Sequence, residues 1–260
     1  MMNINIIAAV GSTVIAFTQN LGKLGLFFVE VIGAFLSLRF YWRIFFKQLL
    51  EIGYYSLPVV GLTAIFTGAV LALQSYTGFS RMNAESAIAS VVALSITREL
   101  GPVLAGLMLS GRVSASIAAE IGSMKVTEQL DALYTLGANP INYLVIPRVM
   151  AGLLMLPCLV LVADIIGILG GYLVAVYKLN FSANLYLTST MNFIKLSDIT
   201  SGLIKSVVFG FIVTFIGCYF GFNSKGGAQG VGYATTSSVV VASILILLTN
   251  YVITGLLFSH

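Results

Sequence analysis

Residues 112–148, RVSASIAAEIGSMKVTEQLDALYTLGANPINYLVIPR, hold six of the 22 charged residues of the chain and lie between two long apolar runs. Apolar residues recur within this stretch at spacings of three and four residues: Ile117, Ile121, Met124, Leu130, Leu133 and Tyr134. That spacing is typical of amphipathic helices. The stretch is therefore predicted to form helices with one apolar and one charged face.

Signals for helix ends divide the stretch in two. Thr127 is predicted to cap a second helix, in which Glu128 and Asp131 lie favourably near the positive end. Gly137 supplies a left-handed stop, and Pro140 prevents the helix from continuing. The result is a helical elbow between two membrane spans. It is either a connecting loop that rests on lipid headgroups or a docking element for a soluble partner.

The composition defines the broad class of protein. Hydrophobic residues make up 58% of the 260 residues and charged residues 8%, and the mean hydropathy is +1.02. A soluble core of this size cannot bury so much apolar surface, so the chain is predicted to be an all-α integral membrane protein. The net charge of +4 is too dilute to indicate binding to nucleic acid. Cys158 and Cys218 both lie in apolar runs, so no disulfide framework is expected.

The N-terminal region is predicted to lie at the membrane surface. Residues 4–18 are apolar but lack a basic start and a small-residue cleavage site, so they are not expected to be a signal peptide. The run Leu24–Leu38 is interrupted by Glu30 and is shorter than the roughly 20 residues that a span needs. Basic and aromatic residues then alternate as in an interfacial helix: Arg39, Phe40, Trp42, Arg43, Phe45, Phe46 and Lys47. An additional span in residues 21–38 is the alternative.

Five later runs are long enough to cross the hydrocarbon: Tyr54–Ser75, Ala87–Leu109, Val149–Val174, Gly202–Phe220 and Ser238–Leu257. We therefore expect interfacial helices in residues 1–50 and a transmembrane domain in residues 51–260. If the N-terminus is inside, the inner segments carry Lys23, Arg39, Arg43, Lys47, Arg112, Lys125, Arg148 and Lys225. The outer segments then carry only Arg81, Lys178 and Lys195. This excess predicts a cytoplasmic N-terminus, a cytoplasmic elbow and an outer C-terminus.

Charges inside the spans need partners. Arg98 and Glu99 lie near the middle of the second span, and a charge there costs at least roughly 2.5 kcal/mol on insertion scales. Pro102 frees the carbonyl of Arg98, so we expect a kink. Asp164 and Lys205 are candidate partners, although Lys205 lies near the outer end of its helix and is able to snorkel. The group is either a structural ion-pair cluster, a site for a polar headgroup or a proton relay.

Signatures of soluble enzymes are absent from the sequence. There is no GxxxxGK[ST] loop to hold ATP, and the glycine-rich residues 226–232 are interpreted as a turn before a span. The only histidine, His260, is the last residue, which excludes HExxH-type zinc sites. We assign no catalytic or metal-binding residue. Small residues at four-residue spacing indicate close helix packing: Gly68 and Ala72, Gly167 and Gly171, and Gly217 and Gly221.

Several blocks resemble the MlaE/YrbE permease family: ALSITRELGPVLAGLMLSGRVSASIAAEIGSMKVTEQLDAL, then LGANP, IPR and GLIKSVVFG. The resemblance runs from about Val60 to the C-terminus. It implies a non-catalytic subunit of a lipid-transporting ABC system in the bacterial inner membrane, with a periplasmic C-terminus. It also implies a second copy of the chain, two cytoplasmic ATPases that bind the ATP and Mg²⁺, a periplasmic ring of MCE-domain proteins and a small regulatory subunit.

The resemblance also assigns site residues. The elbow becomes the coupling helix on the ATPase, with contacts from Glu120, Met124, Lys125, Glu128, Gln129 and Asp131. A phospholipid cavity between the two copies is bordered by Leu71, Gln74, Tyr76, Phe79 and Leu100. Arg98, Glu99 and Lys205 match charged positions of the family, whereas Asp164 does not.

The implied function is ATP-driven movement of phospholipids between the inner and outer membranes, which maintains outer-membrane lipid asymmetry. Two other classes of protein are alternatives to this interpretation. An ion-coupled secondary transporter would use the intramembrane charges directly, but it predicts internal repeats that the five unequal spans do not show. A lipid-modifying enzyme would need a catalytic cluster at the membrane interface, and none is found in the sequence.

Overall fold

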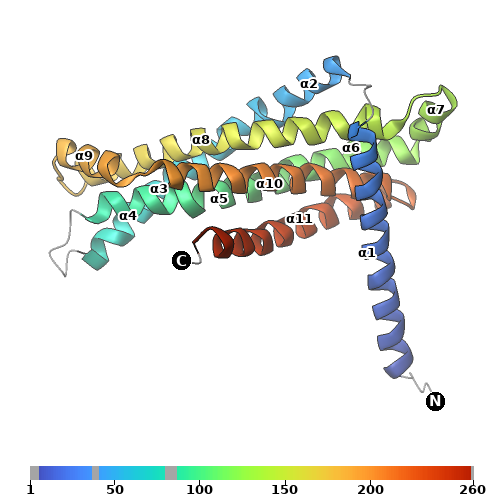
Figure 1. The fold of residues 1–260 in the computed structure, drawn as a ribbon, viewed down its shortest axis with the longest axis horizontal. Coiled ribbons are helices and arrows are strands. Elements are labelled where there is room, and N and C mark those ends of the chain that lie inside the picture. Colours follow the sequence, from blue (N-terminus) through green and yellow to red (C-terminus); the bar gives the residue numbers. More distant parts are fainter. Residues whose placement is uncertain (1–5, 37–40, 80–86, 259–260) are drawn as a thin grey trace.

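The computed structural model of the chain describes residues 6–36, 41–79 and 87–258, and within these residues it contains helices and no strands (Figure 1). The first half comprises α1 (Ile6–Leu36), α2 (Trp42–Ile52), η1 (Tyr54–Ser56), α3 (Leu57–Phe79), α4 (Ala87–Ser95), η3 (Ile96–Leu100), α5 (Gly101–Leu109), η4 (Ser110–Ser114) and α6 (Ala115–Val126). The second half comprises α7 (Gln129–Thr135), η5 (Ile141–Val145), α8 (Ile146–Tyr177), α9 (Ala183–Phe193), α10 (Leu196–Phe222) and α11 (Gly227–Phe258).

Within the described residues, five helical stretches are long and apolar enough to cross a membrane: Trp42–Phe79, Ala87–Val126, Ile141–Tyr177, Leu196–Phe222 and Gly227–Leu257. The predicted all-α membrane fold is therefore confirmed. Each stretch is longer than the apolar run that predicted it, because backbone hydrogen bonding continues past the last apolar residue. The glycine-rich residues 226–232 show this most clearly. Only Gly226 belongs to the turn, and α11 already begins at Gly227, so the prediction of a turn over the whole segment was wrong.

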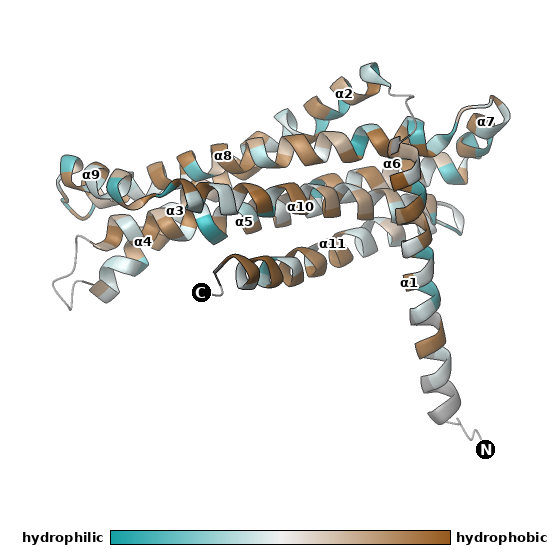
Figure 2. Ribbon diagram, viewed as in Figure 1, coloured by the Kyte–Doolittle hydropathy of each residue, from teal (hydrophilic) through white to brown (hydrophobic). Residues whose placement is uncertain are grey.

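The five stretches lie lengthwise beside one another, with α7 at one end of the bundle and α9 at the other (Figure 1). We call these the α7 end and the α9 end. Brown apolar residues cover the length of the bundle, whereas teal polar residues gather toward its ends (Figure 2). Burial within the single chain differs widely, from 61% of the spanning segment of α10 to 11% of that of α11. Helices α8 and α10 therefore form the centre of the bundle, and α11 lies at its surface.

Helix α1 is one continuous helix that runs crosswise to the bundle at the α7 end (Figure 1). It is not among the five spanning stretches, which favours the interfacial helix over the additional span. The two apolar runs of this region, residues 4–18 and Leu24–Leu38, thus largely fall within one helix. Phe27 and Val31 of α1 are buried, and the ring of Phe27 lies 5.4 Å from that of Phe215 in α10. These contacts hold one side of α1 against the bundle.

Helix α2 follows, with Arg43 and Lys47 exposed and Phe45 buried, as expected of an interfacial helix. The predicted basic residue Arg39 and its neighbour Phe40 lie outside the described residues. Because α2 continues through η1 into α3, the division into domains at residue 50 stays a prediction.

Glycines allow α3, α8 and α10 to cross at backbone contact. A Cβ added to Gly68 of α3 would collide with the carbonyl oxygen of Gly167 in α8, and one on Gly210 of α10 would collide with that of Gly152. A Cβ on Gly221 would meet the side chain of Ile121 in α6. These contacts confirm that the small-residue pairs serve helix packing.

Candidate functional site

The elbow between α6 and α7 is made by the backbone of Glu128, which adopts a left-handed conformation at φ 59°. The hydroxyl of Thr127 donates to the carbonyl of Ser123 at 2.9 Å and so closes α6. The prediction that Thr127 caps the second helix was wrong, because Glu128 occupies the position before α7 and makes no side-chain cap. Gly137 adopts the predicted left-handed conformation at φ 72°, and α7 ends before it.

The elbow presents a mixed acidic and apolar surface. Leu130 is buried and anchors α7, whereas three of the predicted contact residues, Glu128, Gln129 and Asp131, are exposed. Beside them, 57% of Tyr134 and 79% of Leu136 are exposed. We call these five exposed residues the elbow surface: Glu128, Gln129, Asp131, Tyr134 and Leu136. The sequence analysis assigned Tyr134 to the apolar periodicity alone and did not single out Leu136.

Other predicted coupling residues are engaged within the chain. The carboxylate of Glu120 lies 2.6 Å from the guanidinium of Arg148, which is only 2% exposed and also donates to the carbonyl of Leu144. This ion pair ties α6 to the start of α8. Lys125 pairs with Asp131 at 3.4 Å across the elbow. Met124 packs against the main core. Glu120 therefore helps to hold the elbow in place, and contact of these residues with an ATPase stays a prediction.

The intramembrane charges form two ion pairs. The Nε of Arg98 donates to Asp198 at 2.7 Å, and the ammonium of Lys205 lies 2.6 Å from the carboxylate of Glu99. The same ammonium donates to the carbonyl of Arg98 at 2.9 Å. This is the carbonyl that Pro102 was predicted to free, and the backbone around it forms the π-helix η3. The carbonyl of Arg98 therefore serves as an acceptor for a buried cation, and the kink itself stays a prediction.

The structure decides two points about this cluster that the sequence left open. Lys205 does not snorkel, since its side chain is 0% exposed and bound to Glu99. Asp164 lies in α8 against Gly101 and does not join the cluster. Its Oδ1 is buried, and the described residues offer it no hydrogen-bond partner.

The sequence analysis missed three members of the cluster. Asp198 accepts from the backbone of Lys195 as well as from Arg98, at the start of α10. Asn250 and Thr254 of α11 each donate to the carboxylate of Glu99 at 3.0 Å. Their spacing of four residues places both on one face of an otherwise apolar helix, and that pattern was a usable signal.

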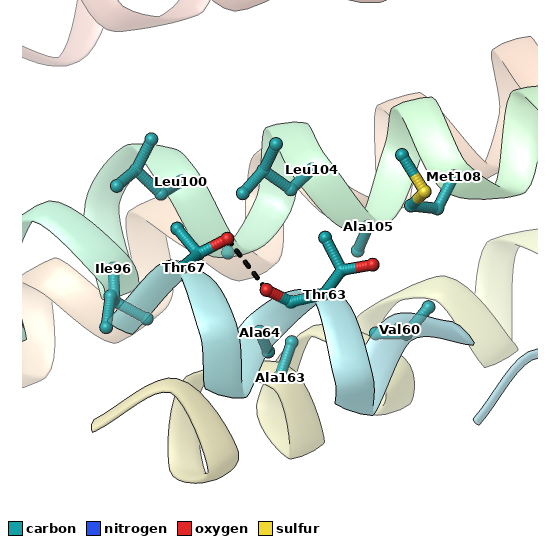
Figure 3. Close-up of a pocket in the computed structure, with 11 residues that line it drawn as sticks. Val60, Thr63, Ala64, Thr67, Ile96, Leu100, Leu104, Ala105, Met108 and Ala163 are labelled. Atoms are coloured by element: carbon teal, nitrogen blue, oxygen red, sulfur yellow. Dashed lines mark hydrogen bonds between the residues drawn. The ribbon is translucent and has the colours of Figure 1, made fainter. Parts of the chain in front are cut away.

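The predicted lipid-contact residues do not share one cavity in the single chain. Leu71, Tyr76 and Phe79 pack against a core cluster that includes Ile88, while Gln74 is exposed. Leu100 lines a small pocket of about 10 Å³ between α3 and α5. Figure 3 shows this pocket, with Thr63 and Thr67 of α3 on one side and Leu100, Leu104 and Met108 on the other. The predicted cavity between two copies at these residues stays a prediction.

No group of His, Cys, Asp and Glu within the described ranges is arranged to hold a metal ion. The site thus consists of an exposed elbow at one end, a buried charge cluster and an apolar pocket. Together they define a helical membrane protein.

Comparison with known proteins agrees with this architecture. Residues 45–256 match the family described as Permease MlaE, so the chain belongs to the MlaE permease family. It is 59% identical over 99% of its length to a probable ABC transporter permease of Rickettsia typhi, all of which is covered. It is 42% identical to a probable ABC transporter permease of Synechocystis, with 82% of this chain and 81% of that protein covered. It is also 38% identical to the chloroplast protein TRIGALACTOSYLDIACYLGLYCEROL 1 of Arabidopsis thaliana, over 88% of this chain and 66% of that protein.

An ABC transporter permease works with ATPase partners, and the chain is accordingly the membrane subunit of such a system.

Proposed function

We propose that this permease moves phospholipid through a cavity between two copies of the chain, driven by cytoplasmic ATPases that bind at the elbow surface. The permease then lies in a bacterial inner membrane, with the elbow on the cytoplasmic side and the C-terminus on the periplasmic side. A ring of MCE-domain proteins receives or delivers lipid at the α9 end, and a small regulatory subunit acts on the ATPase. ATP and Mg²⁺ are bound by the ATPase, and no covalent step occurs in this chain.

The observation that carries the docking step is the exposure of Leu136 and Tyr134 next to the carboxylates of Glu128 and Asp131. When a partner covers apolar side chains that are exposed at the polar end of a membrane protein, the free energy of the complex falls. The acidic side chains beside them favour a partner with a basic groove. The pair of the buried Arg148 with Glu120, together with the buried Leu130, fixes the elbow to the bundle. Closure of the ATPases would therefore move α6 and α8 directly.

Reversing the charge of the elbow surface should release the ATPase. We expect Glu128→Lys/Asp131→Lys to reduce the ATPase that co-purifies with the membrane-inserted permease by at least about tenfold, which corresponds to about 1.4 kcal/mol. Both side chains are exposed, so folding should be unaffected. The control is Glu30→Lys on α1, another exposed acidic position, which should co-purify with the ATPase as the wild type does. Undiminished co-purification with the double variant would contradict docking at this surface.

Two surfaces of the single chain support an intersubunit lipid cavity. Only 11% of the α11 span and 22% of the α3 span are buried, against 61% of α10. The exposed side chains are apolar and include Phe66 and Val70 on α3 and Ile244 and Tyr251 on α11. The pocket at Leu100 lies beside the exposed α3, between α3 and α5. Acyl chains fit such walls, since each buried CH₂ contributes roughly 0.8 kcal/mol. The Arabidopsis relative is named after a lipid, trigalactosyldiacylglycerol, and this agrees with a lipid cargo.

A photo-reactive probe at Leu100 should report on the cavity. In native membranes we expect phospholipid crosslinks that fall severalfold when ATP and vanadate trap the closed ATPases, because the cavity narrows. A probe at Ile165, which is 69% exposed on α8, should crosslink to bulk lipid equally in both states. Equal yields from Leu100 with and without nucleotide would remove this residue from the lipid path. Leu71 is less suitable, because its side chain packs in the core cluster around Ile88.

The intramembrane charges favour this function over an ion-coupled transporter. Each charged member of the cluster is bound to an opposite charge, as in a structural network that fixes helix packing. A transporter driven by ions would move its cargo without the ATPase. Lipid movement in vesicles that contain the permease without the ATPase would therefore support the alternative.

A further inference from the structure

A cavity of about 770 Å³ lies at the α7 end, between α1, the end of α10 and the first turns of α11. Its walls come from segments that are about 200 residues apart in the sequence, Asn20 and Lys23 on one side and Lys225 and Tyr233 on the other. The hydroxyl of Tyr219 donates to the backbone carbonyl of Asn20 at 3.4 Å and links α1 to α10 there. The cavity is distinct from the small pocket at Leu100.

The polar part of the cavity is cationic. Lys23 and Lys225 line it, and no Asp or Glu does. Among the described residues, neither ammonium forms an ion pair or a hydrogen bond, and both side chains are exposed. The position of Lys225 is set by a tight turn, in which Gly226 and Gly227 adopt positive φ. A Cβ on Gly230 would collide with the carbonyl of Lys225, so the turn packs closely on α11.

The rest of the wall combines neutral polar side chains, such as Asn20 and Asn223, with an apolar part that includes Leu21, Leu24, Phe220 and Val240. A free phosphate ion would pair with the lysines but leave these side chains uncovered. A phospholipid would satisfy both parts, with its phosphate between the ammonium groups and its acyl chains along the apolar wall. The outward side chains of α1, such as Leu26 and Val29, are exposed and apolar, as expected of a helix lying in the headgroup region.

We infer that this cavity binds the headgroup of an anionic phospholipid from the leaflet at the α7 end. The bound lipid fills the space between α1 and the bundle and holds the crosswise helix in place. This inference does not depend on the cargo, because it concerns a surface at the opposite end of the bundle from the residues proposed to border the lipid cavity. None of the residues that line the cavity belongs to the elbow surface, so the test needs no ATPase.

The test measures which lipids the purified protein retains. Protein reconstituted in nanodiscs with equal phosphatidylcholine and phosphatidylglycerol is extracted into mild detergent, and the retained lipids are quantified by mass spectrometry. We expect phosphatidylglycerol to be enriched at least about fivefold in the wild type and to approach parity in Lys23→Gln/Lys225→Gln. Ser237→Trp keeps both charges but fills the cavity, and it should lose the enrichment as well.

The matched control is Arg43→Gln/Lys178→Gln, which removes two exposed positive charges elsewhere and should keep the enrichment. Thermal unfolding of each variant verifies that it is folded. Persistent enrichment in Lys23→Gln/Lys225→Gln, or equal loss in the control, would overturn the site. So would a wild type without enrichment, as expected if a second copy covers the cavity. Displacement of the lipid by millimolar inorganic phosphate would assign the site to free phosphate and overturn the proposal that it binds a phospholipid.

Discussion

Lys205→Met is expected to destabilise the permease by up to roughly 3 kcal/mol, because it leaves the carboxylate of Glu99, which is 37% exposed in the single chain, without its cation. Lys205 is fully buried, and its ammonium also occupies the carbonyl of Arg98. Asn250 and Thr254 still donate to Glu99, but two neutral donors do not replace the charge. The measurement is the denaturation midpoint in detergent, together with the amount of protein that accumulates in the membrane.

Two variants separate the loss of the pair from other effects. Lys205→Met/Glu99→Gln removes both charges and should be milder than the single change, since no buried charge remains unpaired. Lys178→Met removes an exposed lysine at the α9 end and should leave the midpoint unchanged. A double variant as unstable as Lys205→Met would show that the packing of the lysine chain, and not the ion pair, is what matters. Glu99→Ala would leave Lys205 unpaired, whereas Arg98 keeps Asp198.

Gly68→Ala is expected to cost about 1–3 kcal/mol or more, although it adds only one methyl group. The new Cβ would collide with the carbonyl oxygen of Gly167, which belongs to the backbone of α8 and cannot rotate away. Helices α3 and α8 would have to separate, and the pocket at Leu100 between α3 and α5 would change shape with them. Protein accumulation and the denaturation midpoint measure the effect.

Gly61→Ala is the control on the same helix. Its Cβ would lie 3.4 Å from the Cδ1 of Ile166, which is an ordinary contact with a flexible side chain. We expect it to be close to neutral. If the two substitutions were equally harmful, the loss would come from glycine replacement in α3 generally and not from the crossing with α8.

Much of the fold follows from the sequence alone. Long apolar runs predict helical spans, because lipid offers no hydrogen bonds to backbone N–H and C=O groups and a helix satisfies them internally. A content of 58% hydrophobic residues argues against a soluble fold. Gly137 marks the end of the elbow because a left-handed backbone favours glycine. Pro102 predicts the free carbonyl of Arg98, since proline excludes the bond that this carbonyl would otherwise accept. These are local properties, so the sequence determines them directly.

The partners of the charged residues were decided only by the tertiary structure. Arg98 and Glu99 are adjacent, yet Arg98 pairs with Asp198 and Glu99 with Lys205, because neighbouring side chains on a helix point in different directions. Asp164 lies in α8, which contributes no member to this cluster, and it faces Gly101 instead. Which ammonium meets which carboxylate depends on the rotation of each helix about its axis. That rotation is fixed by packing, as at the contact of Gly68 with Gly167, and not by hydropathy.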